Sequence, residues 1–177
     1  MSAVAAGGGG GWVVGSRSGR RALIFKPNKD SHSVDGPGQG VKAFRFRVAA
    51  AGTYRIAFRL SAPHWTEYND LWARLGGGAR MVRGGRVRPL SAGWVKVYQN
   101  RGRNQWVLGG VTKDFDGHDL VTRPLRAGET YTLTVSGRSS KLALADVAAF
   151  KCNLPGGCGN GSDGFRRISK MDVSRCA

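Results

Sequence analysis

Apolar and polar residues alternate with a period of two along several short segments of the chain. In AFRFRV, residues 43–48, the phenylalanines and the valine fall on one face of an extended chain and the arginines on the other. TYRIAFRL, residues 53–60, repeats this pattern. Since a period of two is typical of half-buried strands, we predict two strands here, joined as a hairpin by the turn AAAGT, residues 49–53.

The same rhythm continues along the chain. DLWARL, residues 70–75, places its leucines and alanine opposite Asp70, Trp72 and Arg74, and WVKVYQ, residues 94–99, places its valines opposite Trp94, Lys96 and Tyr98. QWVLGGV, TYTLTVSG and LALADVAAF complete a series of at least seven short strands with Gly-, Pro-, Asn- and Asp-rich connections. No long stretch has helical periodicity. We therefore predict an all-β fold, an antiparallel β-sandwich (jelly roll) with irregular N- and C-terminal extensions.

The length of 177 residues suits one domain. We expect a Gly/Arg-rich N-terminal segment with room for first strands at 1–40, the β-sandwich at 41–151, and an irregular Cys-containing tail at 152–177. No apolar run is long enough to cross a bilayer, so we expect no membrane insertion. The N-terminal residues lack a basic segment followed by a Leu-rich core, and a secretion signal is therefore not predicted.

Charge narrows the choice of partner. The net charge is +17, and Arg supplies most of the 28 basic residues. Because the guanidinium group makes planar, bidentate contacts, this composition favours a polyanionic partner: an acidic or sulfated glycan, nucleic acid, or an acidic protein surface. An Arg-rich composition inherited from a GC-rich genome stays open as the alternative.

The basic residues are concentrated between residues 71 and 113, which contain no Asp or Glu. Aromatic rings in or beside this stretch offer faces on which a sugar or base could stack. The alternative for the basic residues is a solvated cationic loop. The alternative for Trp65 is a lid over the end of the sandwich. The candidate ligand-binding residues are Trp65, Tyr68, Tyr98, Arg101, Arg103 and Trp106.

Acidic residues gather on either side of the basic stretch, in TEYND and DFDGHD. Close-spaced carboxylates with a Gly are a common way for a loop to provide oxygen ligands to Ca²⁺, so calcium is the candidate cofactor. The alternative is that these side chains cap turns. The candidate metal ligands are Glu67, Asp70, Asp114, Asp116 and Asp119.

The same carboxylates could serve glycoside hydrolysis, but nothing in the sequence separates an acid from a base among them. No nucleophile-elbow motif surrounds any Ser. We therefore predict that the chain is not an enzyme. The three cysteines, Cys152, Cys158 and Cys176, allow one bridge and a free thiol, or no bridge.

The order of motifs resembles a known domain family. The blocks AGTYRIAFRL, TEYNDLWARL, GWVKVYQNRGRNQW, DFDGHD and GETYTLTVSGRSSKLALADVAAFK are similar to a β-sandwich domain of secreted bacterial polysaccharide-active proteins. That domain resembles carbohydrate-binding modules of the galactose-binding-like or jelly-roll type. The resemblance covers residues 42–151 and implies an antiparallel sandwich, an accessory non-catalytic role, glycan binding and an extracellular location.

We therefore predict a non-catalytic binding module for carbohydrate, with an acidic or sulfated glycan favoured by the charge. The alternative is a structural or scaffold subunit of a larger complex that keeps this fold and binds acidic protein or nucleic acid through basic surfaces. A glycoside hydrolase is the third hypothesis.

Overall fold

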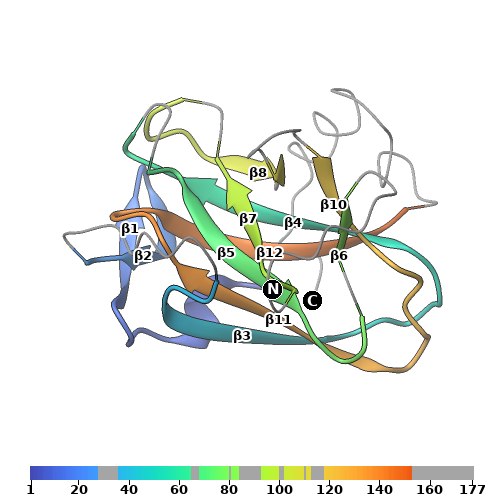
Figure 1. Cartoon of the computed structure of the whole chain (residues 1–177). Helices are drawn as coiled ribbons and strands as arrows, with labels where there is room; N and C mark the ends of the chain where they lie inside the picture. Colours follow the sequence, from blue (N-terminus) through green and yellow to red (C-terminus); the bar gives the residue numbers. More distant parts are fainter. Residues whose placement is uncertain are drawn as a thin grey trace.

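The computed structural model describes residues 1–27, 36–64, 68–79, 81–83, 93–99, 102–109, 111–112 and 118–152. These residues form one short 3₁₀ helix and a series of strands (Figure 1). The elements are η1 (Ala3–Ala6), β1 (Trp12–Arg17), β2 (Arg20–Phe25), β3 (Gln39–Arg47), β4 (Tyr54–Ser61), β5 (Asp70–Leu75), β6 (Met81–Arg83), β7 (Val95–Tyr98), β8 (Val107–Gly109), β9 (Val111–Thr112), β10 (His118–Thr122), β11 (Thr130–Gly137) and β12 (Ala143–Lys151).

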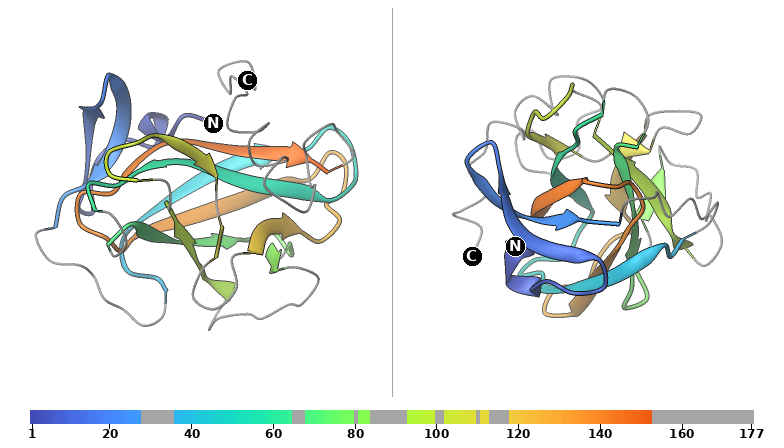
Figure 2. Two further views of the ribbon diagram at one scale, coloured as in Figure 1. Left: turned by 90° about the horizontal axis from the view of Figure 1, so that it is seen from above. Right: turned by 90° about the vertical axis from the view of Figure 1, so that its left-hand side faces the viewer.

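The strands form two antiparallel layers, which confirms the predicted β-sandwich. The first layer runs β1-β2-β12-β4, and β8 and β10 both pair with β4. The second layer runs β3-β11-β5-β7-β9-β10. Strand β10 pairs with β9 through His118 and Asp119 and with β4 through Val121, so it joins the layers. The end-on view of Figure 2 shows the strands surrounding a central core.

The core consists of the inward faces that the alternating pattern predicted. Strand β4 contributes Ile56, Phe58 and Leu60, and the facing layer contributes Leu71 and Leu133, all of them at most 1% exposed. Burying a side chain of this size stabilises the fold by about 1.5–3 kcal/mol. The alternation therefore correctly identified the core-facing residues of β3, β4, β5, β7 and β11.

The predicted hairpin between residues 43–48 and 53–60 is wrong. Strand β3 pairs with β11, strand β4 pairs with β12, and the two strands belong to opposite layers. The connection between them crosses from one layer to the other, and Gly52 forms a bridge with Leu125. Alternation reports which face of a strand is buried, but it does not identify the strand that pairs with it.

The N-terminal residues complete the first layer. Residue Met1 exchanges two backbone hydrogen bonds with Val147 of β12, at 2.7 and 2.9 Å. In β1, the Trp12 ring is 1% exposed and packs 5.0 Å from the Phe25 ring, measured between centroids. The described part of the chain contains no helix long and apolar enough to cross a membrane.

Candidate functional site

Backbone strain is concentrated at one end of the sandwich. Among the described residues, those other than glycine that have a positive φ are Ser18, Tyr68, Asn104 and Lys141, at 45°, 57°, 58° and 62°. All four lie in connections that meet where β4 and β11 end and where β5 and β12 begin. We call this region the loop end; its described residues are 17–19, 62–64, 68–70, 102–106 and 138–142. Strained residues gather at binding and catalytic sites because the surrounding structure must hold them there.

The connections of the loop end are tied to one another by hydrogen bonds. The Asn104 amide donates to the carbonyl of Ala62 at 2.7 Å, and the Arg17 guanidinium donates to the carbonyls of Ser61, at 2.6 Å, and Lys141. These bonds join segments far apart in the sequence. The loop end is therefore a preformed surface rather than a set of independent turns.

Under this surface lies a buried ion pair. The Asp70 side chain is 2% exposed, and its Oδ2 accepts a hydrogen bond from Arg138 Nη1 at 2.5 Å. Its Oδ1 accepts one from Ser139 Oγ at 2.5 Å, and that Oγ accepts one from the Asp70 amide at 3.1 Å. Both carboxylate oxygens are thus engaged, and this charge-assisted network fixes the start of β5 against the β11–β12 connection.

Two buried amide side chains connect the remaining loops. The Asn69 side-chain Nδ2 donates to the backbone carbonyl of Gln99 at 2.7 Å, and the backbone N–H of Gln99 donates to the backbone carbonyl of Asn69 at 2.9 Å. The Gln99 Nε2 donates to the carbonyls of Gly102 and Gln105, both at 3.0 Å. Sequence reasoning did not select Gln99, because a single Gln after a strand carries no recognisable signal.

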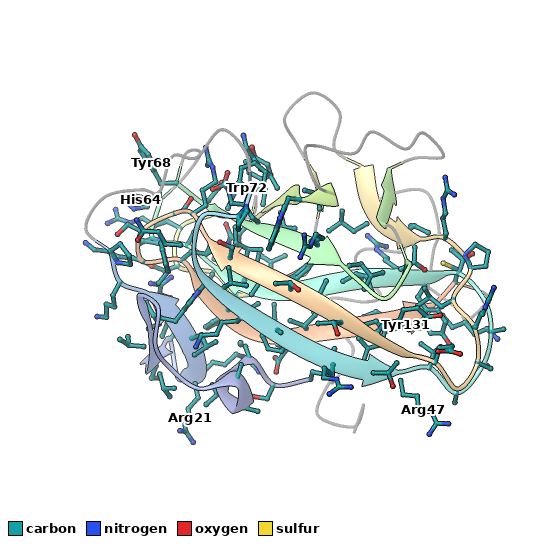
Figure 3. All side chains as sticks on the ribbon, turned by 60° about the horizontal axis from the view of Figure 1, so that its bottom comes forward. Arg21, Arg47, His64, Tyr68, Trp72 and Tyr131 are labelled. Atoms are coloured by element: carbon teal, nitrogen blue, oxygen red, sulfur yellow. The ribbon has the colours of Figure 1, made fainter. Side chains whose placement is uncertain are left out.

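An aromatic pair, the exposed Tyr68 and the half-buried His64, lies next to this network. The Tyr68 side chain is 38% exposed, and its ring lies 5.8 Å from the His64 ring in an edge-on arrangement. Figure 3 shows Tyr68 and His64 at the same corner of the molecule, to the left of Trp72. Because φ of Tyr68 is 57°, a left-handed value that bulky residues rarely adopt, the ring is held outward against a backbone preference.

Half-buried groups border the loop end toward the β1–β2 hairpin. The Trp106 Nε1 donates to the Arg17 carbonyl at 3.0 Å, and its ring packs against the small cluster formed by Ala22, Ile24, Ala143 and Ala145. Burial lowers the pKa of the Arg17 guanidinium from its usual value, since desolvation disfavours the charged form. The structure thus adds a desolvated cation that the sequence did not single out.

The other candidate ligand residues are distributed as follows. Arg103 is exposed within the loop end, and Tyr98 lies half-buried on the outer face of β7, opposite Asp70 in the strand register. Trp65 and Arg101 lie outside the described residues. The structure therefore places Tyr68, Arg103 and Trp106 in the loop end.

The candidate metal ligands are only partly described. Asp70 is engaged by Arg138 and Ser139, and Asp119 occupies the same cross-strand row three strands away, through Tyr98 and Val111. Three strand spacings separate their backbones by about 14 Å. In the portion of the chain with described coordinates, no cluster of three or more His, Cys, Asp or Glu residues is found.

The remaining predicted ligands, Glu67, Asp114 and Asp116, lie outside the described residues. Calcium binding therefore stays a prediction. Cys152 is disulfide-bonded, and both other cysteines also lie outside the described residues.

No family model matches the sequence, and no curated protein matches it either. Solved structures do. A GH26–CBM35 β-(1,4)-mannanase of Podospora anserina is similar over 88% of this chain, with 13% identity and a TM-score of 0.50. This chain covers 27% of the mannanase, about a quarter of its length.

Two further similar structures have TM-scores below 0.50. An Arthrobacter globiformis T6 isomalto-dextranase is 17% identical over 84% of this chain and 22% of its own, with a TM-score of 0.47. A family 35 carbohydrate-binding module from Clostridium thermocellum is 10% identical over 77% of this chain and 82% of its own, with a TM-score of 0.43. At these identities the mannanase match shows the fold alone: a β-sandwich like those of carbohydrate-binding modules, as the motif resemblance implied.

Proposed function

We propose that this chain is a non-catalytic carbohydrate-binding module whose ligand site is the loop end. The observation that carries the proposal is the exposed Tyr68 ring, held in a strained conformation beside His64 and next to a buried polar network. A flat aromatic face with a polar rim suits the apolar faces and hydroxyl groups of a sugar. The likeness in fold to a mannanase that contains a family 35 carbohydrate-binding module supports the same assignment.

We further propose that the glycan is acidic or sulfated. The Asp70 carboxylate, the acidic group among the described residues of the loop end, is neutralised by Arg138. Among the described residues, the cations Arg17, Arg103 and Lys141 of the same region form no ion pair with an acid. Such a surface has a positive field that favours carboxylate or sulfate groups.

Glycan arrays and affinity electrophoresis, with neutral, uronic-acid and sulfated polysaccharides, test the proposal. We expect saturable binding that weakens as salt increases. Replacing Tyr68→Ala should reduce affinity on the order of tenfold or more, because an aromatic platform is lost. Arg103→Ala should lower the affinity and its salt dependence, whereas Arg126→Ala, which removes an exposed Arg at the opposite end of the sandwich, should lower both much less. If the chain bound none of the polysaccharides in the panel, the proposal would be contradicted.

We propose that any bound calcium is held by carboxylates of the two acidic segments, TEYND and DFDGHD, whose candidate ligands are Glu67, Asp70, Asp114, Asp116 and Asp119. Thermal unfolding with and without a chelator provides the test. Calcium at 100 times its dissociation constant should stabilise the folded chain by about 2.7 kcal/mol. An unchanged melting temperature would remove the metal from the proposal without affecting glycan binding.

A further inference from the structure

Strand β1 lies at the end of the first layer and leaves one edge unpaired. It pairs with β2 along residues 12–17, and in the described part of the chain no other strand pairs with it. Figure 1 shows the β1–β2 hairpin projecting at one side of the sandwich. An unpaired edge presents a row of backbone donors and acceptors, which another strand can use.

The register identifies which groups face outward. The two-residue turn Ser18–Gly19 makes Arg17 and Arg20 a hydrogen-bonded pair, so pairing groups alternate along β1. The N–H and C=O groups of Val14 and Ser16 therefore point away from β2. The same alternation predicts that the backbone N–H and C=O of Trp12 also point away from β2. These two groups do exchange hydrogen bonds with the backbone of Gly9, at 3.2 and 2.7 Å.

This edge lacks the features that usually prevent strand addition. Residues 12–16, WVVGS, contain no charge and no Pro. Two apolar side chains are exposed on it, Val13 at 38% and Val14 at 41%. Gly8 lies beside Trp12 and Val14, but in the described part of the chain no hydrogen bond engages the outward backbone groups of Val14 and Ser16. This part of the edge is therefore available for pairing and carries exposed apolar side chains.

The charge around this edge indicates whether a second copy of the chain or a different, acidic strand would bind there. Residues 1–27 contain no Asp or Glu, and the exposed Arg21 lies directly opposite Ser16 in the register. Figure 3 shows the Arg21 side chain projecting away from the hairpin. A second copy would bring the arginines of two hairpins together, and the chain already has a net charge of +17. An acidic strand meets neither obstacle.

We propose that the outer edge of β1 binds an extended, acidic segment of a partner protein, which adds to the first layer as a further strand. A Glu opposite Ser16 faces Arg21 across the small Ser side chain. The next residue of the partner faces the opposite side and contacts Val13. The recognised chemistry is thus an alternation of acidic and apolar residues. This site is separate from Tyr68 and does not depend on glycan binding.

The test uses two synthetic peptides, acetylated and amidated, with three Glu-Val or three Lys-Val repeats. Titration calorimetry and NMR shifts of the Val14 and Ser16 amides should show binding of the Glu-Val peptide alone. Ser16→Pro removes one outward donor at an edge position that tolerates Pro, and it should weaken binding on the order of tenfold. Ser16→Ala, the matched control, should bind like the unchanged chain.

Arg21→Glu tests the charge separately from the backbone and should reverse the preference between the peptides. Equal binding of both peptides, or full binding by a folded Ser16→Pro variant, would overturn the proposal. A dimer in light scattering that Ser16→Pro dissociates would overturn it in favour of a second copy. Because Ser16 lies outside the loop end, glycan binding by Ser16→Pro should be unchanged, which separates this proposal from the proposed function.

Discussion

Strands β3 and β4 have nearly the same sequence pattern but opposite surroundings. Each alternates large apolar residues with arginines, and each turns its apolar face to the core. On β3, Arg45 and Arg47 are exposed to solvent. On β4, Arg55 is 2% exposed and Arg59 9%. The two cationic faces that look alike in the sequence therefore differ completely in the folded chain.

The difference arises from the neighbours of each strand. Strand β3 lies at the end of its layer, with β11 on one side. Strand β4 is central, between β12 and the strands β8 and β10, and the Arg59 Nε donates to Asp146 Oδ2 at 3.0 Å. A charge is tolerated in such surroundings only when it is paired, and the partner comes from β12, far along the chain. A cationic face in an alternating strand is thus a surface feature only at the edge of a layer.

The largest expected effect concerns the inward faces of these strands. Phe58→Ala on β4 should destabilise the fold by about 3–5 kcal/mol, because a side chain with 0% exposure leaves a cavity. Phe46→Ala on β3 should cost clearly less, since Phe46 is only partly buried. Urea unfolding of both variants measures the difference. Equal losses would show that the two strands contribute alike to the core.

A smaller effect is expected from the buried charge. Asp146→Ala should destabilise the fold by about 2 kcal/mol, because Arg59 loses the carboxylate that it contacts, although the pair is partly solvated. Adding Arg59→Met should recover part of this loss, since the uncompensated charge is removed. Chemical denaturation of the single and double variants tests this coupling. Additive losses would contradict it.

The smallest effect on stability is expected on β3. The double change Arg45→Gln and Arg47→Gln should alter the free energy of unfolding by no more than about 0.5 kcal/mol for each residue, because both side chains are exposed. The same variant should elute from an immobilised sulfated polysaccharide at lower salt, since two cations are lost. Glu129→Gln removes an exposed negative charge instead of positive charges, so this variant should elute at a higher salt concentration.

Strand β5 and the candidate site show what a local sequence pattern can and cannot predict. The pattern in DLWARL correctly assigned Leu71, Ala73 and Leu75 to the core and Asp70 and Trp72 to the other face. It predicted nothing about the burial of that other face, where Trp72 is 0% exposed with the cations of Lys96 and Arg138 over its ring, at 5.6 and 5.9 Å. Of the ligand residues predicted from the sequence by residue type, Tyr68, Arg103 and Trp106 lie in the loop end. Gln99 was not anticipated, because a single Gln after a strand does not reveal that its side chain binds the carbonyls of Gly102 and Gln105. Arg17 was not anticipated, because the carbonyls that it binds, of Ser61 and Lys141, belong to distant segments.

The sequence by itself determined the fold class, the inward face of each main strand and the excess of positive charge, because these follow from residue type and a period of two. The tertiary structure alone decided the strand partners, the burial of Arg55 and Arg59, and the meeting of four strained connections at one end. It also left the edge of β1 open beside exposed Val14. Pairing and burial depend on contacts between residues far apart in the chain, and a local pattern cannot specify them.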